Sequence, residues 1–184
     1  MLTREQALEL ARNNVSKNNV ICHMIAVEAI MRSLAKQLDE DTAQWGLVGL
    51  LHDIDYEKTE KTPEKHSILA AEMLKNVLDQ ALIRAIKSHN FENTGEKPET
   101  QMEKALIAAD AVSGLIIACA LVMPSKKLVD VRVESVAKKF KDKDFARGAD
   151  RNKILFCEQL GLSKDKFFQI ALDAVKESAS QIGL

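Results

Sequence analysis

The chain has 184 residues, with 26 lysines and arginines against 27 aspartates and glutamates, a formal net charge of −1. This balance does not predict nonspecific binding to nucleic acids or to anionic membranes, and the length suits one domain with a full-sized core. Aromatic residues make up only 4% of the chain, and there are only 7 glycines and 3 prolines. A core of aliphatic side chains favours helices, and a sandwich or barrel of short strands would need more turn residues.

Three helices are predicted at the start of the chain. Thr3 and Gln6 have the spacing of a capping box, which places the start of the first helix near Thr3. A second helix is expected over about residues 19–38. Asp41 or Thr42 can cap a third, which carries the segment QWGLVGLLHD. The glycines of this segment should let the third helix pack closely against a neighbour.

The middle of the chain alternates predicted loops and helices. The polar stretch 54–62 predicts a loop, and Thr62 followed by Pro63 predicts the start of a fourth helix, because proline suits the first helical position. A fifth helix is expected over about residues 79–89. The segment NFENTGEKPET, residues 90–100, is rich in helix breakers and predicts a loop.

A long apolar helix is predicted over about residues 101–122, ending near Pro124. Polar residues interrupt its apolar run, so we expect a buried helix rather than a membrane span. Two or three further helices should follow, with Gly161 ending one and Ser163 opening the last.

The N-terminus and the cysteines predict a soluble cytoplasmic protein. The N-terminal sequence MLTREQALELARNN is too charged for a signal peptide. Cys22, Cys119 and Cys157 are odd in number and widely spaced, and they form no CxxC pair. We therefore expect no disulfide framework and a reducing compartment.

All four histidines of the chain lie on predicted apolar faces of different helices. Apolar residues stand three, four, seven or eight positions away from His23, His52, His66 and His89, and Asp110 has the same surroundings. Such positions share one face of a helix, so these polar side chains should point into the core. A single histidine in this setting is more often a satisfied core residue than a ligand. Four histidines out of four in the same setting call for a common explanation.

A metal site supplies that explanation. A buried polar group without a partner costs on the order of 1–3 kcal/mol, and a shared cation can serve all of them. Histidine and carboxylate ligands together suit iron, manganese, zinc, cobalt or nickel, and Asp53, beside His52, adds a second carboxylate that can bridge two ions. We therefore predict a buried site for two divalent transition-metal ions, built from His23, His52, Asp53, His66, His89 and Asp110.

These residues resemble the signature of the HD superfamily of metal-dependent hydrolases. That signature has a histidine, then a His-Asp doublet at the end of an apolar helix, then a later aspartate. Here His23, the doublet in GLLHDID and Asp110 in LIAADAV match it in order. The resemblance implies an all-α helical bundle forming one domain, residues 1–184. Its HD-domain core would span residues 20–121, with additional C-terminal helices, residues 124–184, packed on it.

Two further histidines match a two-metal subgroup of this superfamily. They are His66 in PEKHSILAAEML and His89 in AIKSHN. The resemblance implies that His23, His52 and Asp110 hold one ion, that His66 and His89 hold the other, and that Asp53 bridges them. The subgroup includes dinucleoside tetraphosphate hydrolases and cyclic dinucleotide phosphodiesterases, although the Gly-Tyr-Pro triplet of one phosphodiesterase branch is absent. The same six ligands also occur in mixed-valent di-iron oxygenases.

We therefore expect a phosphohydrolase, either a phosphomonoesterase or a phosphodiesterase, that acts on a phosphate ester or nucleotide through a metal-activated hydroxide. Asp53 would be its catalytic residue, because it would hold the ions together and position the hydroxide. The alternative that stays open is a di-iron oxygenase acting on a small polyol or phosphonate. A third alternative is a regulatory module with a degenerate site, and the presence of all six ligands argues against it.

Two regions offer contacts for a small phosphorylated substrate. The segment between His52 and His66 offers Asp55, Tyr56, Lys58 and Lys61, and the basic C-terminal region offers Arg147. The simpler interpretation of both regions, a solvated loop and a solvated helix face with interleaved acids, has more weight. The C-terminal helices should either cap the site or pair subunits in a homodimer, and the sequence leaves both open.

Overall fold

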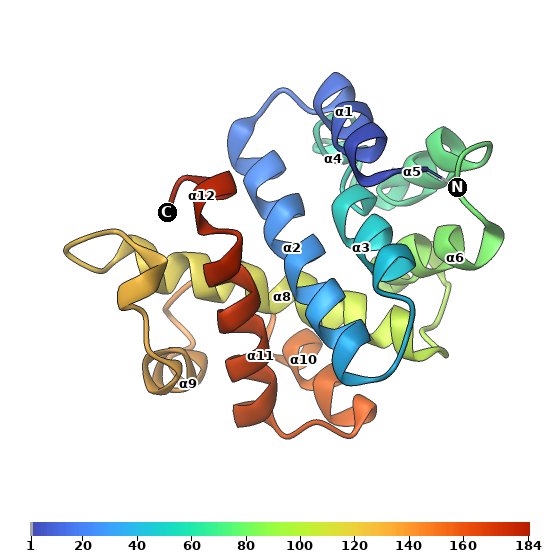
Figure 1. The fold of residues 1–184 in the computed structure, drawn as a ribbon. Helices are drawn as coiled ribbons and strands as arrows, with labels where there is room; N and C mark the ends of the chain where they lie inside the picture. The colour runs from blue at the N-terminus through green and yellow to red at the C-terminus, as the bar shows by residue number, and fades with distance from the viewer. Residues whose placement is uncertain (1) are drawn as a thin grey trace.

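A computed structural model describes residues 2–184, and all of its regular elements are helical (Figure 1). No strand occurs in this described part of the chain, which confirms the predicted all-α class with further helices after the HD-like region. The α-helices are α1 (Arg4–Asn14), α2 (Asn18–Gln37), α3 (Thr42–Leu51), α4 (Tyr56–Thr59), α5 (Ile68–Leu74), α6 (Gln80–Ser88), α7 (Phe91–Thr94), α8 (Gln101–Leu121), α9 (Val133–Lys141), α10 (Arg151–Ile154), α11 (Lys164–Glu177) and α12 (Ala179–Ile182). The 3₁₀ helices are η1 (Pro63–Lys65), η2 (Leu128–Asp130) and η3 (Leu155–Leu160).

Helix α2 is the centre of the fold. It contacts α3 most extensively, and it also packs against α8 and α11. Figure 1 shows α3 on one side of α2 and α11 on the other. Apolar side chains on several faces of α2 are therefore buried, as expected for a helix surrounded by others.

Several helix ends follow from local capping signals in the sequence. The capping box of Thr3 and Gln6 is present at the start of α1, and the carboxylate of Asp41 accepts two backbone N–H bonds at the start of α3. Ser163 caps α11, and Gly161 ends η3 in the left-handed conformation. These features confirm the corresponding predictions.

The close contact between α2 and α3 depends on Gly49. A Cβ atom at this position would stand 2.9 Å from the Val27 carbonyl oxygen and 2.9 Å from the Glu28 Cα, which are both backbone atoms of α2. Backbone atoms cannot turn aside as a flexible side chain can. The glycine therefore sets the distance between the two helices.

Gly49→Ala is expected to lower the free energy of unfolding by about 1–3 kcal/mol, because the added methyl group overpacks a backbone contact. Gly114→Ala is the matched control, since Gly114 also lies inside a helix but a Cβ there would have nothing within 4 Å. We expect this control to raise stability by about 0.5–1 kcal/mol, through helix propensity alone. Urea unfolding followed by circular dichroism measures both, and equal effects would contradict this account of the α2–α3 contact.

The region around His66 differs from the predicted pattern. The expected loop 54–62 contains the short helix α4, and the helix expected from Pro63 is divided into η1 and α5. Ser67 separates them with a left-handed backbone, φ 69°. A serine adopts this conformation only at a cost, so other contacts must hold it there. The break takes His66 out of a regular helix.

Helix α8 runs through the core. In length and hydropathy it could cross a membrane, but 67% of its most apolar window is buried inside the protein. The core helix of a folded domain has the same composition, and the burial agrees with the predicted buried helix.

The C-terminal elements lie against the same central helices. Helix α10 and η3 contact α8, and α11 contacts both α2 and α8. Arg151, the first residue of α10, donates hydrogen bonds to six backbone carbonyl groups between Lys139 and Ala149. This arginine therefore ties the start of α10 to the end of α9 and to the turn between them.

Candidate metal centre

The six predicted ligands come from five separate segments and meet at one cavity. His23 lies within α2 and Asp110 within α8, whereas the other four lie at or beyond helix ends. His52 and His89 are the C-terminal caps of α3 and α6, Asp53 follows His52, and His66 lies between η1 and α5. The cavity has a volume of about 400 Å³. Five of the six line it, while His52 is fully buried.

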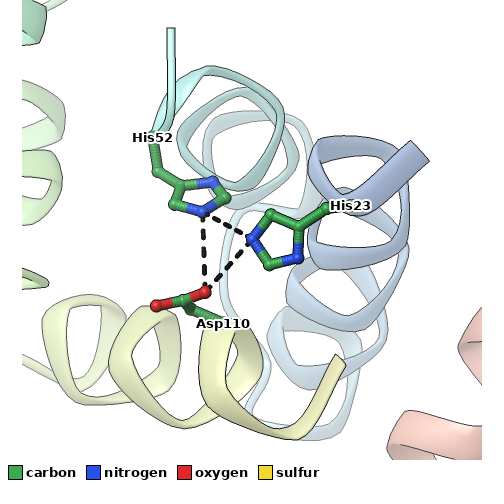
Figure 2. Close-up of side chains that lie close together, drawn as sticks. All are labelled: His23, His52 and Asp110. Carbon is green, nitrogen blue, oxygen red and sulfur yellow. Dashed lines mark hydrogen bonds and ion pairs between the residues drawn. The ribbon is translucent and has the colours of Figure 1, made fainter. Parts of the chain in front are cut away.

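The first group of donor atoms is formed by His23, His52 and Asp110 (Figure 2). The Nε2 atoms of His23 and His52 are 3.2 Å apart. The Asp110 Oδ1 lies 3.1 Å from the His23 Nε2 and 3.8 Å from the His52 Nε2. All three donor atoms thus point toward one common point between α2, α3 and α8.

The second group is formed by His66, His89 and Asp53. The Nε2 atoms of His66 and His89 are 3.0 Å apart. The Asp53 Oδ1 lies 3.3 Å from the His66 Nε2 and 3.7 Å from the His89 Nε2. This group resembles the first in that two imidazole nitrogens and one carboxylate oxygen converge.

Asp53 lies between the two groups and faces both. Its Oδ2 is 3.5 Å from the His23 Nε2, and its Oδ1 is 3.5 Å from the His52 Nε2 as well as close to the second group. The side chain is mostly buried, with 11% of it exposed. No other carboxylate in the described chain contacts histidines of both groups in this way.

The second ring nitrogen of each histidine has a hydrogen-bond partner away from the cavity. The Nδ1–H groups of His52 and His89 donate to the carbonyl oxygens of Gly49 and Ile86, at 2.8 and 2.5 Å. The His66 Nδ1 is 2.9 Å from the Asp55 Oδ1. The His23 Nδ1 is 3.0 Å from the Ser113 hydroxyl. With Nδ1 engaged in this way, the Nε2 atom of each ring faces the other donor atoms and is the atom that can bind a metal.

These donor atoms fit divalent metal ions. Ligands held about 2.0–2.2 Å from one ion lie roughly 3.0–3.5 Å from one another, and most distances within each group fall in or near this range. Neutral imidazoles oriented by outer hydrogen bonds, together with ionised carboxylates, are the usual surroundings of a bound transition metal. The residues present therefore suit a metal in each group.

The pKa shifts show a strongly coupled charge cluster. Burial lowers the pKa of His52 to about 4. Although burial opposes it, the hydrogen bond from His23 lowers the pKa of Asp110 to about 2. Burial also disfavours the charged form of His66, but its contacts with Asp53 and Asp55 raise its pKa to about 10. Carboxylates thus stay ionised at neutral pH, and a cation, either a proton or a metal, must offset them.

Asp55 lies behind His66 rather than in the cavity, although we expected it among the substrate contacts. It is fully buried. Its Oδ1 accepts from the His66 Nδ1, and its Oδ2 accepts from the backbone N–H groups of Ser67 and Ala70, both at 2.9 Å. The carboxylate therefore holds the left-handed Ser67 in place, caps α5 and orients the ring of His66.

Of the other expected substrate contacts, the structure brings only Tyr56 to the cavity. It is partly exposed, and its ring stands edge-on to that of His66. The ammonium group of Lys58 is turned toward Asn14, at 2.6 Å. Lys61 is exposed and does not line the cavity. Arg147 is exposed as well and pairs with Asp144 at the surface.

Lys153 is a lining residue that we did not predict. It comes from α10, and its ammonium group is 3.0 Å from a Glu92 carboxylate oxygen. The sequence contains a basic stretch here, but nothing in its spacing distinguishes this lysine from its neighbours. Its position follows from the packing of α10 against α8. The rest of the lining is neutral: Asn19, Val20, Tyr56 and Asn90.

The fold is all-helical and directs histidine and aspartate donors from several helices into one cavity. This combination defines a class of metal-binding helical domains. A model of the HD domain family matches residues 20–115, just over half of the chain, and the chain belongs to this family. It is therefore a member of the HD-domain superfamily of metal-dependent hydrolases.

The similar curated proteins carry the name Ribonuclease Y. The chain is 30% identical to that of Syntrophotalea carbinolica, 33% to that of Clostridium botulinum and 28% to that of Chloroflexus aurantiacus. Each match covers 97 residues, which is 52% of this chain but only 18% of the relative. The similarity is thus confined to one region of those longer proteins. No solved structure gave a significant match.

Proposed function

We propose that this protein is a two-metal phosphohydrolase that cleaves a phosphate ester of a small molecule or nucleotide. The observation that carries the proposal is the position of Asp53, whose carboxylate oxygens lie 3.3–3.7 Å from histidine nitrogens of both groups. One such carboxylate between two groups of donors is what a bridged pair of cations requires.

In this proposal, five ligands and one shared carboxylate are divided between two ions. His23, His52 and Asp110 would hold one ion, and His66 and His89 would hold the other, with Asp53 common to both. A metal pair supplies an activated water at neutral pH and neutralises charge on phosphoryl oxygens.

The protein's own groups prepare the cavity for that chemistry. The outer hydrogen bonds of the four imidazoles fix the ring orientations before any ligand arrives, so little reorganisation is needed on binding. A volume of about 400 Å³ suits a small molecule that is largely enclosed. Asp53 lines the cavity and would accept a proton or a hydrogen bond from a water bound there.

The proposal predicts that protein purified without chelators contains about two transition-metal ions per chain and releases phosphate in a screen of phosphomonoesters, nucleotides and phosphodiesters. Prolonged dialysis against a chelator should abolish turnover, and manganese, zinc or iron should restore it. Free metal at about 100 times its dissociation constant should add about 2.7 kcal/mol of stability per site, and raise the melting temperature by about 5–10 °C for one site.

Other outcomes would contradict specific parts of the proposal. Two irons per chain with oxygen consumption and no phosphate release would favour the oxygenase instead. Metal uptake without turnover of any compound would favour a regulatory module. A chain that binds no metal under any condition would overturn the metal centre itself.

A further inference from the structure

The cavity contains one cationic side chain that the metal chemistry does not use. Among residues 2–184, Lys153 is the only lysine or arginine that lines it. Only 19% of this side chain is exposed, because α10 packs against α8 and the ring of Phe91 lies 5.8 Å from the ammonium group. A lysine held in a largely buried position beside the candidate metal centre is unlike a freely solvated surface lysine.

The ion pair between Lys153 and Glu92 can be exchanged for a contact between Lys153 and a bound ligand. Glu92 accepts its hydrogen bond at 3.0 Å, but the Glu92 side chain is 54% exposed. An ion pair with an exposed carboxylate is weak, because water and salt compete for both groups. A ligand anion inside the cavity can therefore displace Glu92, and Glu92 then returns to water.

We propose that Lys153 binds a second anionic group of the substrate, so that the substrate is a small phosphate ester carrying another phosphate or carboxylate. This inference rests on the two-metal function above: the reacting phosphoryl group would lie at the histidine and aspartate donors, and the second anion would lie at Lys153. The remaining lining, Asn19, Val20, Tyr56 and Asn90, is neutral and suits the uncharged middle of such a molecule.

The arrangement favours a small molecule with two anionic groups over a polynucleotide. Binding of a nucleic-acid strand draws on several lysines or arginines along the phosphate backbone. Here Lys58, Lys61 and Arg147 are exposed outside the cavity, and the net charge of the chain is −1. A single, largely buried lysine can bind one anionic group in addition to the reacting phosphate.

The test uses phosphonates, which resist hydrolysis, in two matched pairs. 2-Carboxyethylphosphonate is compared with propylphosphonate, and 3-carboxypropylphosphonate with butylphosphonate, by titration calorimetry on the manganese-loaded 184-residue chain. At least one carboxylate should bind about tenfold more tightly than its alkyl partner, the value of one charge-assisted hydrogen bond. Lys153→Met should remove this preference without weakening the alkylphosphonates, and Glu92→Gln, which removes the competing carboxylate, should strengthen it.

Lys143→Met is the matched control, since Lys143 is exposed and does not line the cavity. It should keep the wild-type preference. Alkylphosphonates that bind only when metal is present, with no preference for either carboxylate, would overturn the role of Lys153 and leave the metal function standing. No binding of any phosphonate to metal-loaded protein would overturn both. A preference that survives Lys153→Met, or tight binding of an oligoribonucleotide unaffected by this change, would also contradict the inference.

Discussion

Asp53→Ala is expected to remove bound metal and turnover together. Asp53 is the carboxylate that contacts histidines of both groups, with distances of 3.3–3.7 Å to four imidazole nitrogens. Substitution of a residue that only orients a ligand costs about 10–100-fold in metal affinity or activity. Loss of a carboxylate shared by two ions should therefore cost more than about 100-fold in turnover.

Two measurements separate this effect from simple unfolding. Elemental analysis should show the metal content of Asp53→Ala falling from about two ions per chain to well below one, while circular dichroism retains the helical spectrum. Asp144→Ala is the control, since that aspartate is 88% exposed and pairs only with Arg147. Full metal content and wild-type turnover in Asp53→Ala would refute the assignment of Asp53 as the shared ligand.

Asp55→Asn is expected to empty one metal position selectively. The Asp55 carboxylate accepts from the His66 Nδ1 and from two backbone N–H groups at the start of α5. The side-chain NH2 of an asparagine would face one of these three N–H groups, and two donors cannot form a hydrogen bond. The ring of His66 would therefore lose its orientation. We expect affinity at the position held by His66 and His89 to fall by about 10–100-fold, with a cost of about 1–3 kcal/mol in stability.

Metal titration followed by calorimetry would show this as the loss of one of two binding steps. The position formed by His23, His52 and Asp110 should keep its affinity, because none of its donors contacts Asp55. Asp41→Ala is the matched control: it removes the cap of α3 and lowers stability by about 1 kcal/mol without touching the site. Equal weakening of both metal positions in Asp55→Asn would mean that Asp55 acts only on the fold.

Much of the fold could be predicted from local patterns. The capping box at Thr3, the Asp41 cap and the glycine after η3 act through neighbouring residues, so the sequence shows them directly. The long buried α8 follows from its composition, because a helix apolar on all faces must be covered. Predicted boundaries differ from the observed ones where a distant contact intervenes, as at Ser67, whose left-handed backbone depends on Asp55.

The convergence of the six ligand candidates could also be expected from the sequence by itself. The four histidines and Asp110 are polar residues among apolar positions, and burying all of them in one small domain almost requires that they share a partner. Asp53 joins the set as the neighbour of His52. The order of the motif then indicated the HD family, to which the chain belongs.

Which polar residues surround that centre was decided only by the tertiary structure. Asp55 and Lys153 show no distinguishing sequence pattern: one is sealed behind His66, and the other reaches the cavity from α10. The expected contacts Lys58, Lys61 and Arg147 do not line the cavity. The physical reason is that hydrophobic periodicity specifies which face of a helix is buried, whereas the direction of an individual polar side chain depends on the packing of elements far apart in the sequence.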